Sequence, residues 1–198
     1  MSVEHLNLEL FYLLNVPEHA APFMQHFAMF IAHDLIYLML LVFAVIWLRG
    51  QRWAKILLIK AVCFTAVALC ISEVLSTVLN TPRPFVMEVG RTLIEHDATG
   101  AFPSNHMTIF SGIALSYYFS VKREIGRLLI AVAWLVAWSR IYVGVHFPID
   151  MLGGFLIAFM VNWLGLPLWH KYADKLMDVV LWLHEKIFAV FIRQGWVK

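Results

Sequence analysis

The sequence predicts an all-α membrane protein, a polytopic bundle of about five to six transmembrane helices. Of its 198 residues, 62% are hydrophobic and only 14% are charged, which leaves too little polar surface to cover a water-soluble domain. A hydrocarbon core of roughly 30 Å is crossed by about 20 helical residues, and five apolar runs come near that length. The runs are 22–48, 54–79, 105–121, 127–145 and 149–168. With no linker or internal repeat, they form one domain, 1–198.

Two segments outside these runs also predict helices. Residues 3–16 mix leucines with Glu4 and Glu9 and are short for a span, which predicts an interfacial or re-entrant helix. The tail 176–192 is apolar but contains ionisable residues such as Glu185, whose burial in lipid is costly. We expect an in-plane cytoplasmic helix there, with a sixth span as the alternative.

The basic residues gather in segments that alternating spans would place on one side of the membrane. These are Arg49, Arg52, Lys55, Lys122, Arg123, Arg127, Lys171 and Lys175. By the positive-inside rule that side is cytoplasmic, and the loop 80–104 and the turn near 146–150 lie on the opposite face. The formal net charge of +2 is too small to indicate a nucleic-acid partner.

Four polar or thiol side chains inside the runs favour structural roles. Cys63 and Cys70 lie seven residues apart on one predicted helix, which favours buried small residues over a disulfide or a metal site. His33 and Asp34, inside the first run, favour a polar contact between helices.

Three polar stretches, 82–84, 103–106 and 139–150, end or begin apolar runs on the same predicted face. They supply two arginines, a serine, two histidines and a carboxylate, which are the groups that bind a phosphate, attack it and protonate the leaving group. The residues are Arg83, Ser104, His106, Arg140, His146 and Asp150. The leading interpretation is a membrane-embedded lipid phosphatase.

Ser104 precedes an apolar helix, so it is a natural N-cap, and the first backbone N–H groups of that helix can bind an anion. His106 lies within the first turn and reaches the same anion. The alternative is that Ser104 only caps the helix while His106 lies at the lipid interface.

His146 and Asp150 are four residues apart, so they share a helical face or meet across the turn at Pro148. Asp150 then accepts a hydrogen bond from Nδ1 of His146, which leaves Nε2 as a nucleophile. Such a pair is often only structural. Arg140, at the end of an apolar run on the same face, favours a polyanion site.

These residues carry a family resemblance over about residues 76–150. Arg83-Pro84, Pro103-Ser104-x-His106 and Ser139-Arg140-x5-His146-x3-Asp150 resemble the three-part signature of the type 2 phosphatidic acid phosphatase (PAP2) superfamily. Phe102 before the second part, and a loop that contains Ile94-Glu95-His96, are similar to its bacterial undecaprenyl-pyrophosphate phosphatase branch.

The resemblance implies a role for each matching residue. His146 matches the nucleophile that becomes a phosphohistidine, Asp150 the carboxylate that orients it, and His106 the general acid. The phosphate-binding groups it implies are Arg83, Ser104, Arg140 and Asn105 with its neighbouring amides. It implies no metal or other cofactor, because two arginines take that role.

The chain departs from the family pattern at two positions. Seven positions before the arginine, where the family usually has a lysine, this chain has Ser76. Either a diphosphate substrate is bound differently, or Arg91 compensates for the missing cation. The usual small residue between the serine and the histidine is Asn105, which adds a side-chain donor. Glu73, two turns from the end of its span, is either a partner of the arginines or a protonated structural residue.

The expected activity is dephosphorylation of undecaprenyl diphosphate outside the cytoplasm of a bacterial inner membrane, which recycles the cell-envelope lipid carrier. Its expected partners are that lipid substrate and membrane lipids, and the oligomeric state is open. The alternatives are a phosphatase or phosphotransferase of another lipid, such as phosphatidylglycerol phosphate or phosphatidate, and a transporter that binds without cleaving. A metal site of His106, His146 and Asp150 is a further alternative.

Overall fold

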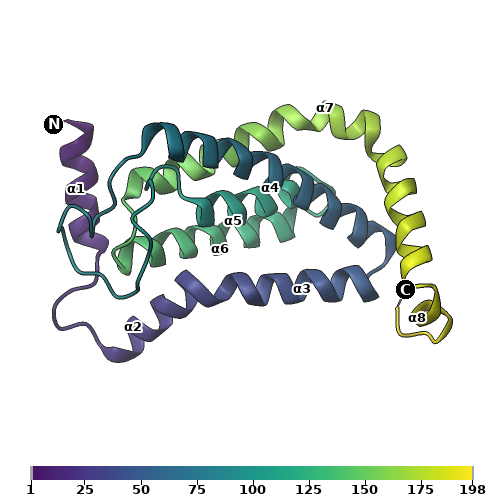
Figure 1. Cartoon of the computed structure of the whole chain (residues 1–198), viewed down its shortest axis with the longest axis horizontal. Coiled ribbons are helices and arrows are strands. Elements are labelled where there is room, and N and C mark those ends of the chain that lie inside the picture. Colours follow the sequence, from purple (N-terminus) through teal and green to yellow (C-terminus); the bar gives the residue numbers. More distant parts are fainter. Residues whose placement is uncertain (1, 198) are drawn as a thin grey trace.

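The computed structural model describes residues 2–197, which contain helices and no strand (Figure 1). This confirms the predicted all-helical fold class. In chain order the elements are α1 (Val3–Leu14), α2 (Pro22–Met29), the π-helix η1 (Phe30–Asp34), α3 (Leu35–Arg49), α4 (Arg52–Leu79), α5 (Asn105–Tyr118), α6 (Arg123–Tyr142), α7 (Pro148–Ile187) and α8 (Ala189–Arg193).

Four helical segments of the described chain are long and apolar enough to cross a membrane, which makes this a multi-pass membrane protein. They are Pro22–Arg49, Arg52–Leu79, Arg123–Tyr142 and Pro148–Ile187. The remaining predicted run, 105–121, corresponds to α5, whose 14 residues extend only about 21 Å. It packs against α4, α6 and α7, and most of its side chains are buried (Figure 1). Helix α5 is therefore the central helix of the bundle.

Helix α7 is much longer than the run 149–168 predicts. It continues for 40 residues and takes in most of the tail, with Pro167 in its interior. Its last part turns down across the end of the bundle (Figure 1), where Asp178 pairs with Arg52 at 3.7 Å. Helix α7 therefore runs through Pro167 without ending, and most of the tail 176–192 is a continuation of α7 and not a separate helix.

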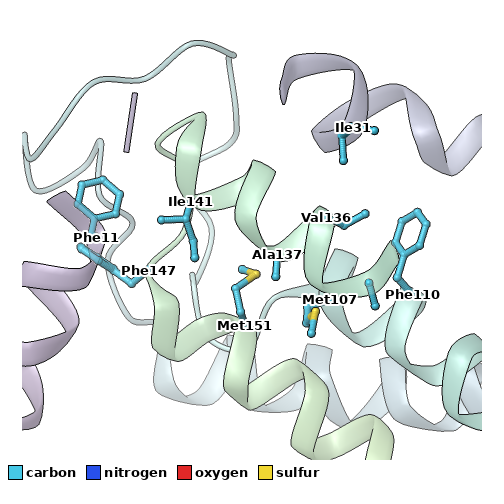
Figure 2. Close-up of a cluster of buried hydrophobic side chains, with 10 residues drawn as sticks. Phe11, Ile31, Met107, Phe110, Val136, Ala137, Ile141, Phe147 and Met151 are labelled. Carbon is cyan, nitrogen blue, oxygen red and sulfur yellow. The ribbon is translucent and has the colours of Figure 1, made fainter. Parts of the chain in front are cut away.

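The packed core joins helices from both ends of the sequence (Figure 2). Phe11 of α1 packs on Phe147 with ring centroids 5.1 Å apart, and Met151 extends the cluster along α7. Met107 of α5 is fully buried in the same cluster. The two polar stretches that contain His106 and His146 are therefore held by apolar contacts immediately beside them.

Polar contacts add to the packing of α5 on α7. Asn162 is fully buried; its amide donates to the Gly112 carbonyl at 3.2 Å, and its oxygen accepts from the Ser116 hydroxyl at 2.7 Å. Such bonds between helices satisfy groups that lipid cannot. These hydrogen bonds fix the position of α5 along α7, whose first turn contains the end of the third polar stretch.

Two expectations about polar side chains in the spans are wrong. Cys63 is partly buried but Cys70 is exposed, because it lies on the outward side of α4; both thiols are free. His33 and Asp34 bond to each other at 2.7 Å and are both more than half exposed, so they do not join two helices. Their place on η1, where the helical register changes, turns them outward.

Helix α1 lies across the end of the bundle, beside the loop 80–104 and the start of α7 (Figure 1). Its N-cap Ser2 accepts from the His5 amide at 3.2 Å, and Asn7 accepts from the Ile149 amide at 3.0 Å. The prediction of a short helix there is confirmed. Because the loop and the turn before α7 lie at this same end, the three polar stretches meet there.

Candidate active site

A cavity of about 540 Å³ opens at this end of the bundle. It lies within the size range of small-ligand pockets. Its walls come from the end of α4, the loop 80–104, the start of α5 and the end of α6. The lining residues are Glu73, Ser76, Thr77, Asn80, Arg83, His96, Thr99, Gly100, Pro103, Asn105, His106, Arg140 and His146.

His146 is a buried histidine on the short connection between α6 and α7. The chain turns there at Gly144, whose φ of +83° and close approach to the Arg91 carbonyl leave no room for a side chain. Nδ1 of His146 lies 3.1 Å from Oδ2 of Asp150. Because a carboxylate only accepts, Nδ1 carries the proton and Nε2 has the electron pair.

Asp150 is fixed independently of the histidine. Its Oδ2 also accepts from the Phe147 amide at 2.8 Å, in the first turn of α7.

Burial, together with the charges of Arg140 and Arg83, holds the pKa of His146 well below its usual 6.5. At neutral pH the imidazole is therefore uncharged, which is the nucleophilic form.

Arg83 is a clamp whose five N–H groups all have protein acceptors. Nε donates to the Thr99 carbonyl at 2.9 Å, and one terminal nitrogen donates to Thr99 Oγ1 at 3.3 Å and the Gly100 carbonyl at 3.2 Å. The other donates to the Val145 carbonyl at 3.1 Å and to Nε2 of His146 at 3.0 Å. Arg83 thus fastens the loop and covers the electron pair of the nucleophile, which an incoming phosphorus must displace.

Arg140 has the opposite pattern. It is 2% exposed, and NH1 donates to the Ala32 carbonyl of η1 at 3.2 Å. Its Nε and NH2 are buried without a protein acceptor. A guanidinium with two unpaired N–H directions at a cavity wall is expensive to bury unless an anion completes it. These two nitrogens form a fork that fits two phosphate oxygens.

The N-terminus of α5 forms another side of the cavity. Ser104 is fully buried and caps the helix, with its Oγ 3.5 Å from the Met107 amide, and it is not among the lining residues. Asn105 accepts from Ser72 at 2.9 Å and donates to Glu73, so its side chain joins α5 to α4. His106 follows on the cavity wall. The free amides of this first turn supply further anion donors.

The positions that depart from the family pattern hold the wall of the cavity together. Ser76 donates to the Gly100 carbonyl at 3.1 Å, which brings the loop directly onto α4. Arg91 does not compensate for the missing lysine, because it donates to the carbonyls of Pro17 and Glu18 at 2.7 and 3.0 Å outside the cavity. Glu73 lines the cavity and bonds to Asn105, and no ion pair joins it to Arg83 or Arg140 among the described residues.

Of the seven residues predicted for the site, five line the cavity and two support it from behind. Arg83, Asn105, His106, Arg140 and His146 form the first group; Ser104 and Asp150 form the second. Sequence reasoning did not select the loop residue His96 or the wall residues Thr77, Asn80 and Thr99. The proximity of Glu95-His96-Asp97 to the second motif was the available signal for the loop. In residues 2–197 no three His, Cys, Asp or Glu side chains are grouped to hold a metal ion.

Comparisons with known proteins identify the family of the chain. The PAP2 superfamily model matches residues 57–174. The chain is 39% identical over 99% of both lengths to YbjG of Escherichia coli K12, which is provisionally named as an undecaprenyl-diphosphatase. It is 30% identical to undecaprenyl-diphosphatase BcrC of Bacillus subtilis, covering 92% of this chain and 93% of that protein.

A solved structure extends the agreement to three dimensions. The crystal structure of Aquifex aeolicus LpxE matches with a TM-score of 0.65 at 31% identity, over 84% of this chain and 99% of that one.

Proposed function

The chain belongs to the PAP2 superfamily, and we propose that it removes the terminal phosphate of undecaprenyl diphosphate through a phosphohistidine at His146. One observation carries the chemistry: a neutral, Asp150-bound histidine lines the same cavity as Arg140, which has two nitrogens without a protein acceptor. The names of the relatives that match over nearly the full chain support the polyprenyl diphosphate as substrate.

The reaction has two displacements that balance. Nε2 of His146 attacks the terminal phosphorus, and the bond to the bridging oxygen breaks, so that the lipid monophosphate leaves with a proton from His106. His106 then takes a proton from water, which attacks the phosphorus and breaks the P–N bond. Arg140 and the α5 amides hold the equatorial oxygens in both steps, and Asp150 stabilises the imidazolium.

The membrane side follows from the charges at the two ends of the bundle. The basic residues of the α3–α4 and α5–α6 turns lie at the end opposite the cavity. By the positive-inside rule, the cavity faces the outside of a bacterial inner membrane. There the enzyme would return the carrier lipid to its monophosphate form.

The test is phosphate release by the purified protein in detergent with EDTA, comparing undecaprenyl diphosphate with phosphatidylglycerol phosphate and phosphatidate. We expect at least about tenfold faster release from the diphosphate, because its leaving phosphate is a better leaving group than an alkoxide. Faster release from either monophosphate would assign a different lipid substrate. No release from any of the three, with intact binding, would indicate a carrier.

Replacing His106 separates the two classes of substrate. Because a leaving phosphate needs less protonation than a leaving alkoxide, His106→Ala should reduce turnover of a lipid monophosphate more than that of the diphosphate. Loss of general acid catalysis typically costs about 10²–10⁴-fold, and we expect the larger value for phosphatidate. Equal losses in kcat for both substrates would contradict the assignment of His106 as the acid.

A further inference from the structure

His96 belongs to the active-site cavity although it lies outside the three polar stretches. It comes from the loop 80–104 and lines the cavity together with His106, Arg140 and His146. Its ring centroid is 6.2 Å from that of His146, with the planes at 77°. A side chain of the loop thus lies beside the nucleophile in the cavity.

The donors already around His146 leave one side of a bound phosphate without a partner, and His96 lies on that side. A phosphoryl group in transfer distributes its charge over three equatorial oxygens. Arg140 offers two unpaired nitrogens from α6, whereas all five N–H groups of Arg83 already have acceptors. On the loop side, therefore, Arg83 can offer only the N–H that it donates to Nε2 of His146 and that the attacking phosphorus would release. His96 is the cavity residue on that side that can acquire a charge.

The ring of His96 has one nitrogen to offer. Nδ1 lies 3.0 Å from the Asp97 carbonyl, which only accepts, so Nδ1 carries a proton and Nε2 is left for a ligand. Burial lowers the pKa of His96, the Asp97 carbonyl opposes this, and both arginines lower it further. The free ring is thus neutral. A bound phosphate reverses this balance, because its negative charge favours a proton on Nε2 that then donates to an oxygen.

Several other charged or titratable groups act on the same ring. They are Arg83 and Asp97 from the loop, Arg140 from α6, His106 from α5 and His146 from the α6–α7 connection, and Glu73 of α4 lines the same cavity. Two arginines and one carboxylate, Asp97, act on the charge of His96, and this excess of positive charge favours an anion as the ligand beside the ring. His96 also lines two outer pockets of the loop, one with Glu95 and Asp97, so it stands between the cavity and the surface.

We propose that His96 binds, through Nε2, the phosphate group that His146 attacks, and that it holds the same group as inorganic phosphate before release. The inference rests on the proposed phosphatase function. It adds a substrate-contacting residue from the loop to the donors of α5 and α6. The ligand chemistry is a phosphate monoanion or dianion, whether attached to lipid or free.

The test is inhibition by inorganic phosphate, because the product contacts the same donors without the lipid. In His96→Ala the inhibition constant for phosphate should rise about tenfold or more, as expected for a lost charge-assisted hydrogen bond. In His96→Asn the rise should be smaller, because the amide can still donate. His19→Ala is the matched control, since His19 is an exposed histidine that does not line the cavity.

The pH dependence gives a second readout. Wild-type inhibition should weaken as pH rises from 6 to 8 more steeply than inhibition of His96→Asn, whose donor needs no proton. An unchanged inhibition constant in folded His96→Ala, or identical pH slopes in wild type and His96→Asn, would overturn the inference. Folding is checked by thermal unfolding and gel filtration in detergent.

This outcome is distinguishable from failure of the proposed function. If the wild type releases phosphate but His96→Ala binds phosphate normally, only the role of His96 is wrong. If the wild type releases no phosphate from any lipid, the phosphatase proposal fails. Calorimetric binding of inorganic phosphate to wild type and His96→Ala then still tests the contact directly, and equal affinities would overturn it.

Discussion

Replacing His146 with alanine should abolish phosphate release, leaving only the background of the protein-free assay. No other described side chain both lines the cavity and presents a nitrogen fixed by a buried carboxylate. Arg140 and the α5 amides still bind the phosphate in this variant, but without a nucleophile they hold a stable ester or anhydride. The measurement is phosphate release from undecaprenyl diphosphate with EDTA present.

Folding must be separated from chemistry in this variant. Removing the imidazole leaves one N–H of Arg83 without its partner and leaves Asp150 with only the Phe147 amide, and a buried group left unpaired typically costs about 1–3 kcal/mol. His146→Asn is the better-matched variant, because its amide can still donate to Asp150. We expect it to unfold near the wild-type temperature and to be equally inactive. Substantial turnover by folded His146→Asn would contradict the phosphohistidine mechanism.

The covalent intermediate gives an independent check. With substrate labelled in the terminal phosphate, rapid acid-free quenching should recover label on the wild-type protein and none on His146→Asn. Protein-bound label that persists in His146→Asn would place the intermediate on another residue.

Sequence patterns predicted the convergence of the catalytic groups because those groups have short, fixed spacings. The four-residue spacing of His146 and Asp150 brings them together whatever the rest of the fold does, and the Phe147-Pro148 start of α7 fixes the turn. Ser104 predicted the start of α5 through its capping chemistry. These are local relations, and the alternation of spans then brings the local units to one end.

The parts that sequence did not predict depend on long-range contacts. The path of the loop 80–104 follows no periodicity, so nothing local indicates that His96 faces His146 while Arg91 binds the carbonyls after α1. The two motif arginines look equivalent as residues, yet Arg83 is saturated and Arg140 is not. That difference arises from the carbonyls of Thr99 and Gly100, which lie outside the motifs, and of Val145, an unspecified position within the third motif.

The continuity of the tail with the last span also depends on long-range contacts. Ionisable residues in an apolar segment predict a helix outside the lipid, but they do not reveal that the helix is continuous with the preceding span. Lys55 and His184 approach to 2.8 Å, and both are buried, so α4 holds the end of α7 at the far end of the bundle. The local sequence of the tail does not reveal this contact with another helix.

Arg140→Met should lower activity by about 10³-fold or more while leaving thermal stability equal to or above that of the wild type. Removal of one donor to a developing oxyanion costs about 10²–10³-fold, and this change removes both unpaired nitrogens together. The same nitrogens are unsatisfied in the free protein, and methionine fills a similar volume without a charge to desolvate. The buried, unpaired nitrogens of Arg140 are thus expected to lower the stability of the free protein, because their role is to bind the ligand.

Phosphate separates the two effects. Because a ligand stabilises the state that binds it, inorganic phosphate should raise the unfolding temperature of the wild type but not of Arg140→Met. Arg140→Lys keeps the charge without the fork and should respond weakly. If Arg140→Met instead unfolds at a much lower temperature, the bond from NH1 to the Ala32 carbonyl outweighs the two unpaired nitrogens. Arg140 would then be a structural tie between α6 and η1, and the phosphate would have to be held mainly by the α5 amides and the loop.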